Sequence, residues 1–287
     1  SPIDVIYLDF RKAFDTVPHE RLLLKLRSYG ITGNVLDWIR TFLSGRSQRV
    51  KVGQEYSERK NVMSGIPQGS ILGPVLFTVF INDLPEVVSS ATKVFADDTK
   101  VYNSPDNSNI LQEDLNKLKA WSDLWQLYFN TDKCKVLHIG KNNPLKDYYM
   151  KLGDNQVRLG DCESEKDLGV TFDMNLNFDV HIQNAINKAN MMLGIIRRTF
   201  VYMDEESFLL LFKSLVRPHL EYGNIIWCPF LKRQSAAIER VQRRATKLLP
   251  NLKELSYPER LTALRLPSLK ARRVRGDLIQ TFKIFNQ

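Results

Sequence analysis

The sequence predicts an α+β protein in two parts, a first part with a small antiparallel sheet and helices (1–175) and a basic helical second part (176–287). Three observations favour this division. Short strand-like apolar runs alternate with amphipathic segments in the first part, helical periodicity dominates from about residue 178, and basic residues gather in the same region. We place the boundary near residue 175.

The first elements follow helix start and stop signals. Residues 5–8 form a strand-like apolar run close to the first residue, and no initiator methionine precedes it. We therefore expect that the sequence starts inside a larger protein. Pro18 and Gly30 bound a leucine-rich helix, and Thr32 can cap a second helix that ends at Gly45.

The later elements alternate between strands and helices. In order we expect a hairpin of 49–52 with 61–62 across Gly53-Gln54, a turn at 65–73, an apolar helix from 75 to 84 ended by Pro85, and strands at 93–95 and 100–102 around Asp97-Asp98. These are followed by a long helix and, after it, a strand at 136–139, a hairpin through Gly153-Asp154-Asn155, a strand at 168–172, and a helix that Ser235 can cap. The long helix carries one apolar stripe, formed by Leu111, Leu115, Leu118, Trp121, Trp125 and Tyr128.

Charge divides the chain where periodicity does. From residue 181 onward there are 19 Lys and Arg against 8 Asp and Glu, a net charge of +11, whereas the first 180 residues hold 22 against 24, a net charge of −2. A basic module suits a polyanionic partner, because neutralised phosphates release counterions. Solvated helix faces without a partner would give the same composition, so charge alone leaves both interpretations open.

The cysteines and histidines indicate no metal or disulfide framework. Cys134, Cys162 and Cys228 lie far apart and form no CxxC pair, and four scattered histidines give no zinc-ligand spacing. We therefore expect reduced thiols in an intracellular protein. No apolar run is long enough to span a bilayer, so we expect no membrane partner.

Three aspartates stand where the flanking sequence gives no structural reason for them. Asp9 ends an apolar strand, and Asp97 and Asp98 occupy the tip of a hairpin, although turn chemistry alone would also explain that pair. Carboxylates brought together repel one another unless cations are bound. Hard divalent ions, Mg²⁺ or Mn²⁺, are the natural compensation, and two ions about 4 Å apart would activate a 3′-hydroxyl and stabilise a pyrophosphate leaving group.

Five segments resemble motifs of reverse transcriptases of the non-LTR retrotransposon (LINE, Jockey-like) type, and residues 218–285 are similar to the thumb of Jockey-type elements. In chain order the five are Leu8-Asp9-Phe10-Arg11-Lys12-Ala13-Phe14-Asp15, Ser64-Gly65-Ile66-Pro67-Gln68-Gly69-Ser70, Phe95-Ala96-Asp97-Asp98, Asn130-Thr131-Asp132-Lys133 and Leu168-Gly169-Val170. Each alone is weak, but five in the right order over nearly the whole chain are specific.

The resemblance implies a right-hand polymerase palm with a small antiparallel sheet, followed by an α-helical thumb. It implies an RNA-directed DNA polymerase that uses an RNA template, a DNA primer, dNTPs and two Mg²⁺ or Mn²⁺ ions, in the nucleus and cytoplasm as a ribonucleoprotein. The fingers region, whose basic residues hold the triphosphate, is largely missing from the sequence, so we expect this chain alone to polymerise poorly. Nothing in the sequence indicates an oligomeric state.

The resemblance also implies roles for single residues. Asp9, Asp97 and Asp98 would form the catalytic, metal-binding carboxylate cluster, and Phe14 would lie under the incoming sugar and exclude a 2′-hydroxyl. Residues that would contact nucleotide, template or leaving pyrophosphate are Gln68, Gly69 and Lys133. Without the resemblance, Phe14 is a core aromatic, the Pro-Gln-Gly segment a turn, and Lys133 a surface lysine.

Basic residues of the second part could follow the phosphates of a template–primer duplex without reading its sequence. They form two clusters, Arg240, Arg243, Arg244 and Lys247 on one helix and Lys270, Arg272, Arg273 and Arg275 after it. If they only solvate helix faces, removing them will leave the salt dependence of binding unchanged.

Three alternatives stay open. The chain could be a catalytically inactive, truncated copy that only binds nucleic acid. RNA-dependent RNA polymerases share the palm, and the spacing from Asp9 to Asp15 suits them, although Phe14, residues 66–69 and Ala96 favour DNA synthesis. A plain Mg²⁺-dependent nuclease would leave the Pro-Gln-Gly segment and the thumb without a purpose.

Overall fold

A computed structural model of the protein describes residues 1–153 and 155–286, and its contacts divide the chain into two compact units, Ser1–Glu163 and Ser164–Gln287. The division comes before the boundary expected near residue 175. The reason is the hairpin of β12 (Ser164–Asp167) and β13 (Val170–Asp173), which packs through β13 against helix α6 (Asp179–Thr199).

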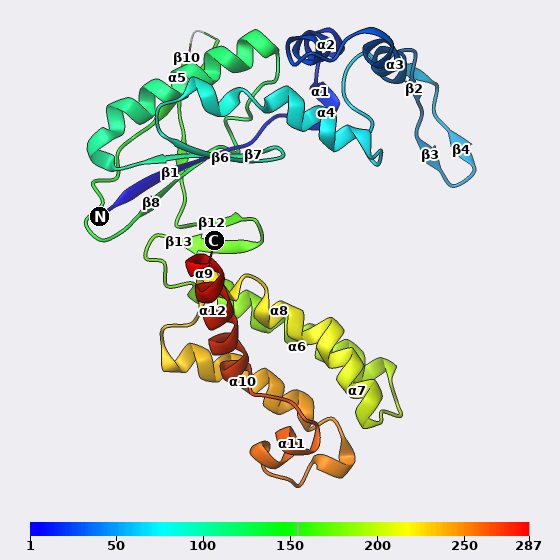
Figure 1. Ribbon diagram of the computed structural model, residues 1–287, viewed down its shortest axis with the longest axis vertical. Helices are drawn as coiled ribbons and strands as arrows, with labels where there is room; N and C mark the ends of the chain where they lie inside the picture. Colours follow the sequence, from blue (N-terminus) through cyan, green and yellow to red (C-terminus); the bar gives the residue numbers. More distant parts are fainter. Residues whose placement is uncertain (154, 287) are drawn as a thin grey trace. The chain divides into compact units, whose positions relative to one another are not determined.

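A five-stranded sheet forms the centre of the first unit, with β1 as its middle strand (Figure 1). The strand order is β11-β8-β1-β7-β6, and every neighbouring pair is antiparallel except β11 with β8. The strands are β1 (Ile3–Leu8), β6 (Ala91–Phe95), β7 (Asp98–Asn103), β8 (Lys135–Ile139) and β11 (Gly160–Asp161). The strands predicted at 93–95, 100–102 and 136–139 are confirmed.

Strand β1 is apolar because it lies between two paired strands and under covering side chains. Ile6 and Leu8 are buried, as is the exception, Asp4. The Asp4 carboxylate is tolerated there because several polar groups hydrogen-bond to it. These are Asn143 Nδ2 at 2.8 Å, Tyr148 OH at 2.6 Å and His138 Nδ1 at 2.7 Å.

The helices of the first unit are α1 (Ala13–Thr16), α2 (His19–Ser28), α3 (Gly33–Leu43), α4 (Leu72–Ile81) and α5 (Ser108–Trp125). Helix α5 lies over one face of the sheet (Figure 1) and buries the three leucines and Trp121 of the predicted stripe. Tyr128, predicted to continue the stripe, lies beyond the end of the helix and is exposed. The prediction that Pro85 ends α4 is wrong. The helix ends at Ile81, and Pro85 lies in the first turn of a 3-10 helix (Leu84–Val87), where its missing N–H costs nothing.

Short two-stranded hairpins complete this unit. A hairpin does turn at Gly53 and Gln54 as predicted, but the predicted pairing of 49–52 with 61–62 is wrong, because β3 pairs with β4 and β2 pairs with β5 in two separate ladders. A further hairpin joins β9 to β10, and Asp154 at its predicted tip lies outside the described residues. Their bounds are β2 (Ser47–Gln48), β3 (Lys51–Val52), β4 (Glu55–Tyr56), β5 (Lys60–Asn61), β9 (Tyr149–Leu152) and β10 (Asn155–Arg158).

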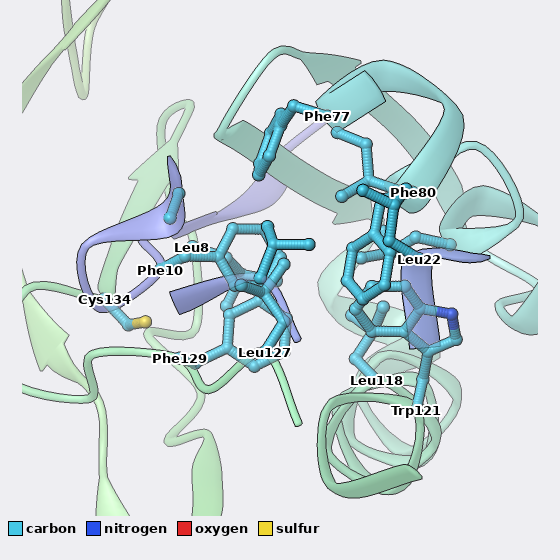
Figure 2. Close-up of a cluster of buried hydrophobic side chains, with 14 of the residues drawn as sticks. Leu8, Phe10, Leu22, Phe77, Phe80, Leu118, Trp121, Leu127, Phe129 and Cys134 are labelled. Atoms are coloured by element: carbon cyan, nitrogen blue, oxygen red, sulfur yellow. The ribbon is translucent and has the colours of Figure 1, made fainter. Parts of the chain in front are cut away.

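The core of the first unit fixes the end of β1. Figure 2 shows Leu8 and Phe10, which flank this strand end, among buried side chains from the helices, including Phe80 and Trp121. The rings of Phe10 and Phe129 stack with centroids 4.5 Å apart. Because burying one large apolar side chain stabilises by about 1.5–3 kcal/mol, these contacts hold the strand end in one position.

The second unit is helical apart from its hairpin. Its elements after α6 are α7 (Glu205–Leu211), a π-helical turn (Phe212–Val216), α8 (Arg217–Glu221), α9 (Asn224–Trp227), α10 (Lys232–Thr246), a 3-10 turn (Pro250–Leu252), α11 (Tyr257–Ala263) and α12 (Leu269–Phe285). Helix α10 contacts α6, α11 and α12 around a separate apolar core that includes Trp227, Ile238 and Val241. In the described residues, no helix is both long and apolar enough to cross a membrane.

The strand predicted at 168–172 is found as β13, but its predicted start and the predicted cap of α10 are wrong. Leu168 and Gly169, expected to begin a strand, form the turn between β12 and β13 with φ of 45° and 86°, left-handed values that end strand pairing. Ser235, expected to cap α10, lies inside its first turn. The helix begins at Lys232, and Gln234 Oε1 accepts the hydrogen bond from Leu231 N at 3.2 Å.

Candidate active site

Asp9 directly follows β1, with its side chain turned away from the core. Leu8 and Phe10 on either side are each 3% exposed, whereas the Asp9 side chain is 40% exposed. In extended chain, neighbouring side chains point to opposite faces, so the burial of the two apolar residues directs the carboxylate outward. The Asp9 carbonyl accepts a hydrogen bond from Asn130 N at 2.7 Å, which ties this strand end to the segment after α5.

Lys133 reaches Asp9 from that segment. Residues 130–134 form a turn in which Lys133 N and Cys134 N both donate to Asn130 O at 3.0 Å. The turn brings Lys133 Nζ to 3.3 Å from Asp9 Oδ2. Both side chains are well exposed, so the pair stabilises the fold by no more than about 1 kcal/mol. Its significance is that the first and fourth motif segments lie together.

Asp97 and Asp98 lie at the tight turn between β6 and β7. Phe95 pairs with Asp98, which leaves Ala96 and Asp97 as the two turn residues, and Ala96 takes a left-handed φ of 52°. The next pair along the sheet is Leu8 of β1 with Thr99 of β7. Asp9 and Asp98 therefore lie at the same end of the adjacent strands β1 and β7. The sheet topology brings the three aspartates together at this end of the strands.

The segment 64–70 docks by its backbone onto the chain that follows Asp9. Gly65 N donates to Val17 O at 2.8 Å, and Ile66 N donates to Phe14 O at 2.7 Å. A Cβ at Gly65 would stand 2.5 Å from the carbonyl oxygen of Asp15, and φ there is +87°. Only glycine fits this close approach without strain.

One open cavity of about 450 Å³ is lined by Phe14, Gln68, Gly69 and Asp97. It joins three of the segments that resemble polymerase motifs. The half-buried Phe14 ring is fixed from behind by Phe77, with ring centroids 4.6 Å apart. Gln68 Nε2 donates to Asp15 Oδ1 at 3.0 Å, so a carboxylate of the first motif orients the amide of the second.

The sequence did not indicate the groups that hold this loop. The carbonyl of Gly65 lies 2.7 Å from Arg46 Nη2 and 2.9 Å from His19 Nε2. Burial lowers the pKa of Arg46. The sequence marks Asp15 only by its spacing from Asp9, and no local pattern predicts its contact with Gln68. These residues come from helix ends and hairpins that carry no local sign of the loop they support.

The three aspartates suit a divalent ion in chemistry, because carboxylate oxygens are the ligands that Mg²⁺ and Mn²⁺ prefer. All three side chains are at least partly exposed, at the same end of the sheet strands. Within residues 1–153 and 155–286, however, no three acidic, histidine or cysteine side chains are gathered closely enough to form a metal-binding group. In this structure the cation beside Asp9 is the ammonium of Lys133.

The basic residues predicted to contact phosphates separate into two groups. Arg272 forms a bidentate salt bridge with Glu221, with contacts of 2.5 and 2.9 Å, and Arg273 is buried, 3% exposed. Arg272 is therefore engaged by a carboxylate, and Arg273 lies inside the unit rather than on its open surface. The exposed members of the set are Arg240, Arg243, Arg244, Lys247 and Lys270, together with Arg275. Their contacts with nucleic acid stay predictions.

Comparisons with known proteins identify relatives. Residues 4–172 match the family described as reverse transcriptase (RNA-dependent DNA polymerase). The RNA-directed DNA polymerase from mobile element jockey of Drosophila melanogaster is 30% identical over 236 residues, covering 76% of this chain and 25% of that protein. The probable RNA-directed DNA polymerase from transposon X-element of the same species is 25% identical over 259 residues, covering 85% of this chain and 28% of that protein.

Among solved structures, apo telomerase from Candida tropicalis covers 87% of this chain and 42% of its own, with 8% sequence identity and a TM-score of 0.48. That likeness is too weak to support a conclusion about this chain. The chain spans between a quarter and three-tenths of the length of the first curated relatives, from 25% to 29%. Because the family match covers more than half of its residues, the chain belongs to the reverse transcriptase (RNA-dependent DNA polymerase) family.

Proposed function

We propose that this chain is the polymerase core of an RNA-directed DNA polymerase from a non-LTR retrotransposon, which extends a DNA primer along an RNA template with dNTPs. The observation that carries the proposal is the open cavity, whose wall joins Phe14, Gln68 and Gly69 to Asp97. Asp9 and Lys133 lie at the same end of the sheet strands as Asp97. The printed names of the jockey and X-element relatives support the same activity.

Phe14 is proposed to select the sugar of the incoming nucleotide. Its ring lines the cavity and cannot retreat, because Phe77 stacks on its other side at 4.6 Å. A fixed aromatic ring under the sugar leaves no room for a 2′-hydroxyl and so favours dNTPs over rNTPs. Gln68 and Gly69, which also line the cavity, would contact template and nucleotide, with the Gln68 amide held by Asp15.

Reverse transcriptases use divalent metals, and in this chain Asp9 and Asp97, with Asp98 beside them, would hold two Mg²⁺ or Mn²⁺ ions. Bound there, the ions would stabilise the negative charge of the 3′-oxygen and of the phosphates. The exposure of the carboxylates leaves them accessible to ions that arrive with the nucleotide.

The proposed reaction transfers a nucleotidyl group. The primer 3′-oxygen forms a bond to the α-phosphorus of the dNTP, the bond from that phosphorus to the bridging oxygen breaks, and pyrophosphate leaves. The proton of the 3′-hydroxyl passes to water. Lys133 Nζ, held near Asp9, would neutralise the leaving pyrophosphate and could give it a proton.

The two compact units would then act as palm and thumb. The first unit would carry the chemistry, and the exposed cations of α10 and α12 in the second unit would contact the phosphates of the template–primer duplex. Such contacts hold a duplex without reading its sequence, as a polymerase requires.

The test is primer extension on an RNA template with all four dNTPs and Mg²⁺, beside the Asp97→Ala variant. Extension that the variant abolishes, with little use of rNTPs, is the expected result. Absence of extension by the unmodified chain, with salt-sensitive binding of the template–primer retained, would instead identify a nucleic-acid-binding protein without catalysis. Equal extension by Asp97→Ala would contradict the proposed site.

A further inference from the structure

A second open cavity, of about 580 Å³, lies wholly within the second unit between α10, α12 and the segment 228–231. It has no part in the proposed polymerase chemistry. Arg273 lines it, although only 3% of this residue is exposed. Arg273 Nη2 donates to Ser235 Oγ at 2.9 Å, whereas Nη1 has no hydrogen-bond partner among the described residues.

The other largely buried arginines of this unit have polar partners that Arg273 lacks. Arg272 is satisfied by both carboxylate oxygens of Glu221. Arg260, equally buried, donates to Thr246 Oγ1 at 3.0 Å and to Leu255 O at 2.5 Å. Arg273 has no carboxylate within salt-bridge distance in the described part of the chain. A buried guanidinium without an ion pair is costly, and an anionic ligand would offset that cost.

The cavity wall carries a net positive charge, which also favours an anionic ligand. It carries four cations, Lys232, Arg243, Lys270 and Arg273, and two carboxylates, Glu239 and Asp277. Glu239 is already engaged, because it accepts hydrogen bonds from Leu269 N at 3.2 Å and Lys270 N at 3.1 Å. Asp277 lies 3.7 Å from Cys228 Sγ. The excess of two positive charges matches a phosphate, which carries about −1.5 to −2 at neutral pH.

An aromatic ring stands at the same cavity. Phe230 is 97% exposed, so it contributes almost nothing to the core of the unit. Exposed aromatic side chains beside cations are the usual platform for a nucleic-acid base, because every base has a face that can stack. The wall therefore offers both a place for a phosphate and a surface for an adjacent base.

We propose that this cavity is a binding site for a phosphate group of a nucleotide, held by Arg243, Lys270 and Arg273 with its base against Phe230. The phosphate could be the terminal group of a mononucleotide or a phosphodiester within a strand. Arg243 and Lys270 belong to the exposed cations that are proposed above to contact template–primer phosphates, but binding at this cavity requires no catalysis, so it can be studied in Asp97→Ala protein. Failure of the polymerase and failure of this site are thus distinguishable.

The experiment is calorimetric titration of the full Asp97→Ala chain with inorganic phosphate, dAMP and deoxyadenosine. We expect phosphate and dAMP to bind, dAMP more tightly, and deoxyadenosine not to bind detectably. Adding Arg243→Gln with Lys270→Gln will weaken dAMP binding at least tenfold, because each charge-assisted hydrogen bond lost is worth about that factor. The exposed Lys253→Gln control will change it less than twofold, and Phe230→Ala will remove the advantage of dAMP over phosphate.

A five-nucleotide single strand completes the test. If the strand binds more tightly than dAMP, the ligand is a phosphodiester; if the two bind equally, the ligand is a terminal phosphate. Both outcomes support the site, provided that the Arg243 and Lys270 substitutions weaken the binding. Equal binding of deoxyadenosine and dAMP, or equal losses in the Lys253 control, would overturn the proposal. So would no binding of any phosphate. Arg273→Gln is informative only where its melting temperature stays close to that of the parent.

Discussion

The two units expose charge in opposite ways. In the first unit, the acidic groups of the candidate active site stand in the open at strand ends, and each is positioned by backbone pairing behind it. In the second unit, two of the basic residues expected at the surface are withdrawn into it, one on Glu221 and one beside Ser235. The first arrangement can be recognised from short sequence motifs, whereas the second depends on the packing of helices distant in sequence.

The difference teaches which charges are available for function. An aspartate after a buried strand is directed outward by the burial of its neighbours, so its exposure follows from local pattern. Consecutive residues on a helix point about 100° apart, so Arg273 cannot share the face on which Arg272 and Arg275 lie. Charge counts overestimate the cations that can meet a phosphate.

The largest expected effect tests the exposed carboxylates. Asp9→Asn should lower primer extension by more than about 100-fold, because losing even an outer-shell partner of a metal ligand costs about 10- to 100-fold. The melting temperature should hardly change, since the side chain is 40% exposed. Asp37→Asn, an exposed aspartate on α3, is the control and should keep full activity. A large loss of stability in Asp9→Asn would mean that the carboxylate serves the fold.

The next effect tests whether the loop is held by its backbone. Gly65→Ala should destabilise the first unit by about 2–4 kcal/mol, from the left-handed φ together with the clash against Asp15. Gly53→Ala has a similar φ but open space around the new Cβ, so it should cost only about 1–2 kcal/mol. Urea denaturation of both variants measures the difference. Equal losses would show that the close approach to Asp15 does not matter.

Much of the first unit could be predicted from its sequence because its signals are local. Alternation and turn residues identified β6, β7 and β8, and the position of Asp9 followed from the apolar run before it. The supports of the site could not be predicted, since Arg46 and His19 meet Gly65 from 19 and 46 residues away. Pairing of that kind has no periodicity to reveal it.

Lys25 shows the same limit in the core. It lies in a leucine-rich helix and is 2% exposed, with its Nζ 4.0 Å from the centre of the Trp125 ring and ion-paired with Asp83. Burial lowers its pKa, and Asp83 opposes that shift. A lysine in an amphipathic segment is expected on the solvent face, and only the tertiary contacts with two tryptophans explain why this one is inside.

Alkaline pH should affect the two units differently through their thiols. Burial raises the pKa of Cys134 from 9.0 to about 11. Below pH 9 the thiol is protonated in both states and its stabilising contribution is complete. Between pH 9 and 11 the unfolded chain releases the proton first, so stability falls, by up to about 1.4 kcal/mol per pH unit.

Urea denaturation of the unmodified chain and Cys134→Ala at pH 8, 9 and 10 isolates this contribution, because other ionisations cancel in the difference. The stability gap between the two should narrow as the pH rises. Cys228→Ala is the matched change in the second unit, where the thiol is exposed, and its gap should vary less. A gap for Cys134→Ala that is independent of pH would contradict the burial of this thiol beside Asp9.

A smaller effect concerns Phe14. Phe14→Val should raise the use of rNTPs relative to dNTPs by about tenfold, the factor that about 1.4 kcal/mol of lost exclusion gives. Phe77→Leu removes the stacked ring behind Phe14 without opening the cavity wall directly, so it should change the ratio less. Primer extension with dNTPs and rNTPs in competition measures the ratio of rNTP to dNTP use. An unchanged ratio in Phe14→Val would return this residue to the role of a core aromatic.

The smallest effect separates the exposed cations of the second unit from the withdrawn ones. Arg240 is exposed on α10, and if it meets one phosphate, Arg240→Gln should reduce the salt slope of duplex binding by about 0.9. Arg272→Gln should leave that slope unchanged but lower stability by about 1 kcal/mol, because it breaks the pair with Glu221. Template–primer affinity between 50 and 200 mM salt measures the slopes. A change in slope for Arg272→Gln would mean that its pair with Glu221 opens when nucleic acid binds, and the contrast between the two groups of cations would then be a property of the free protein only.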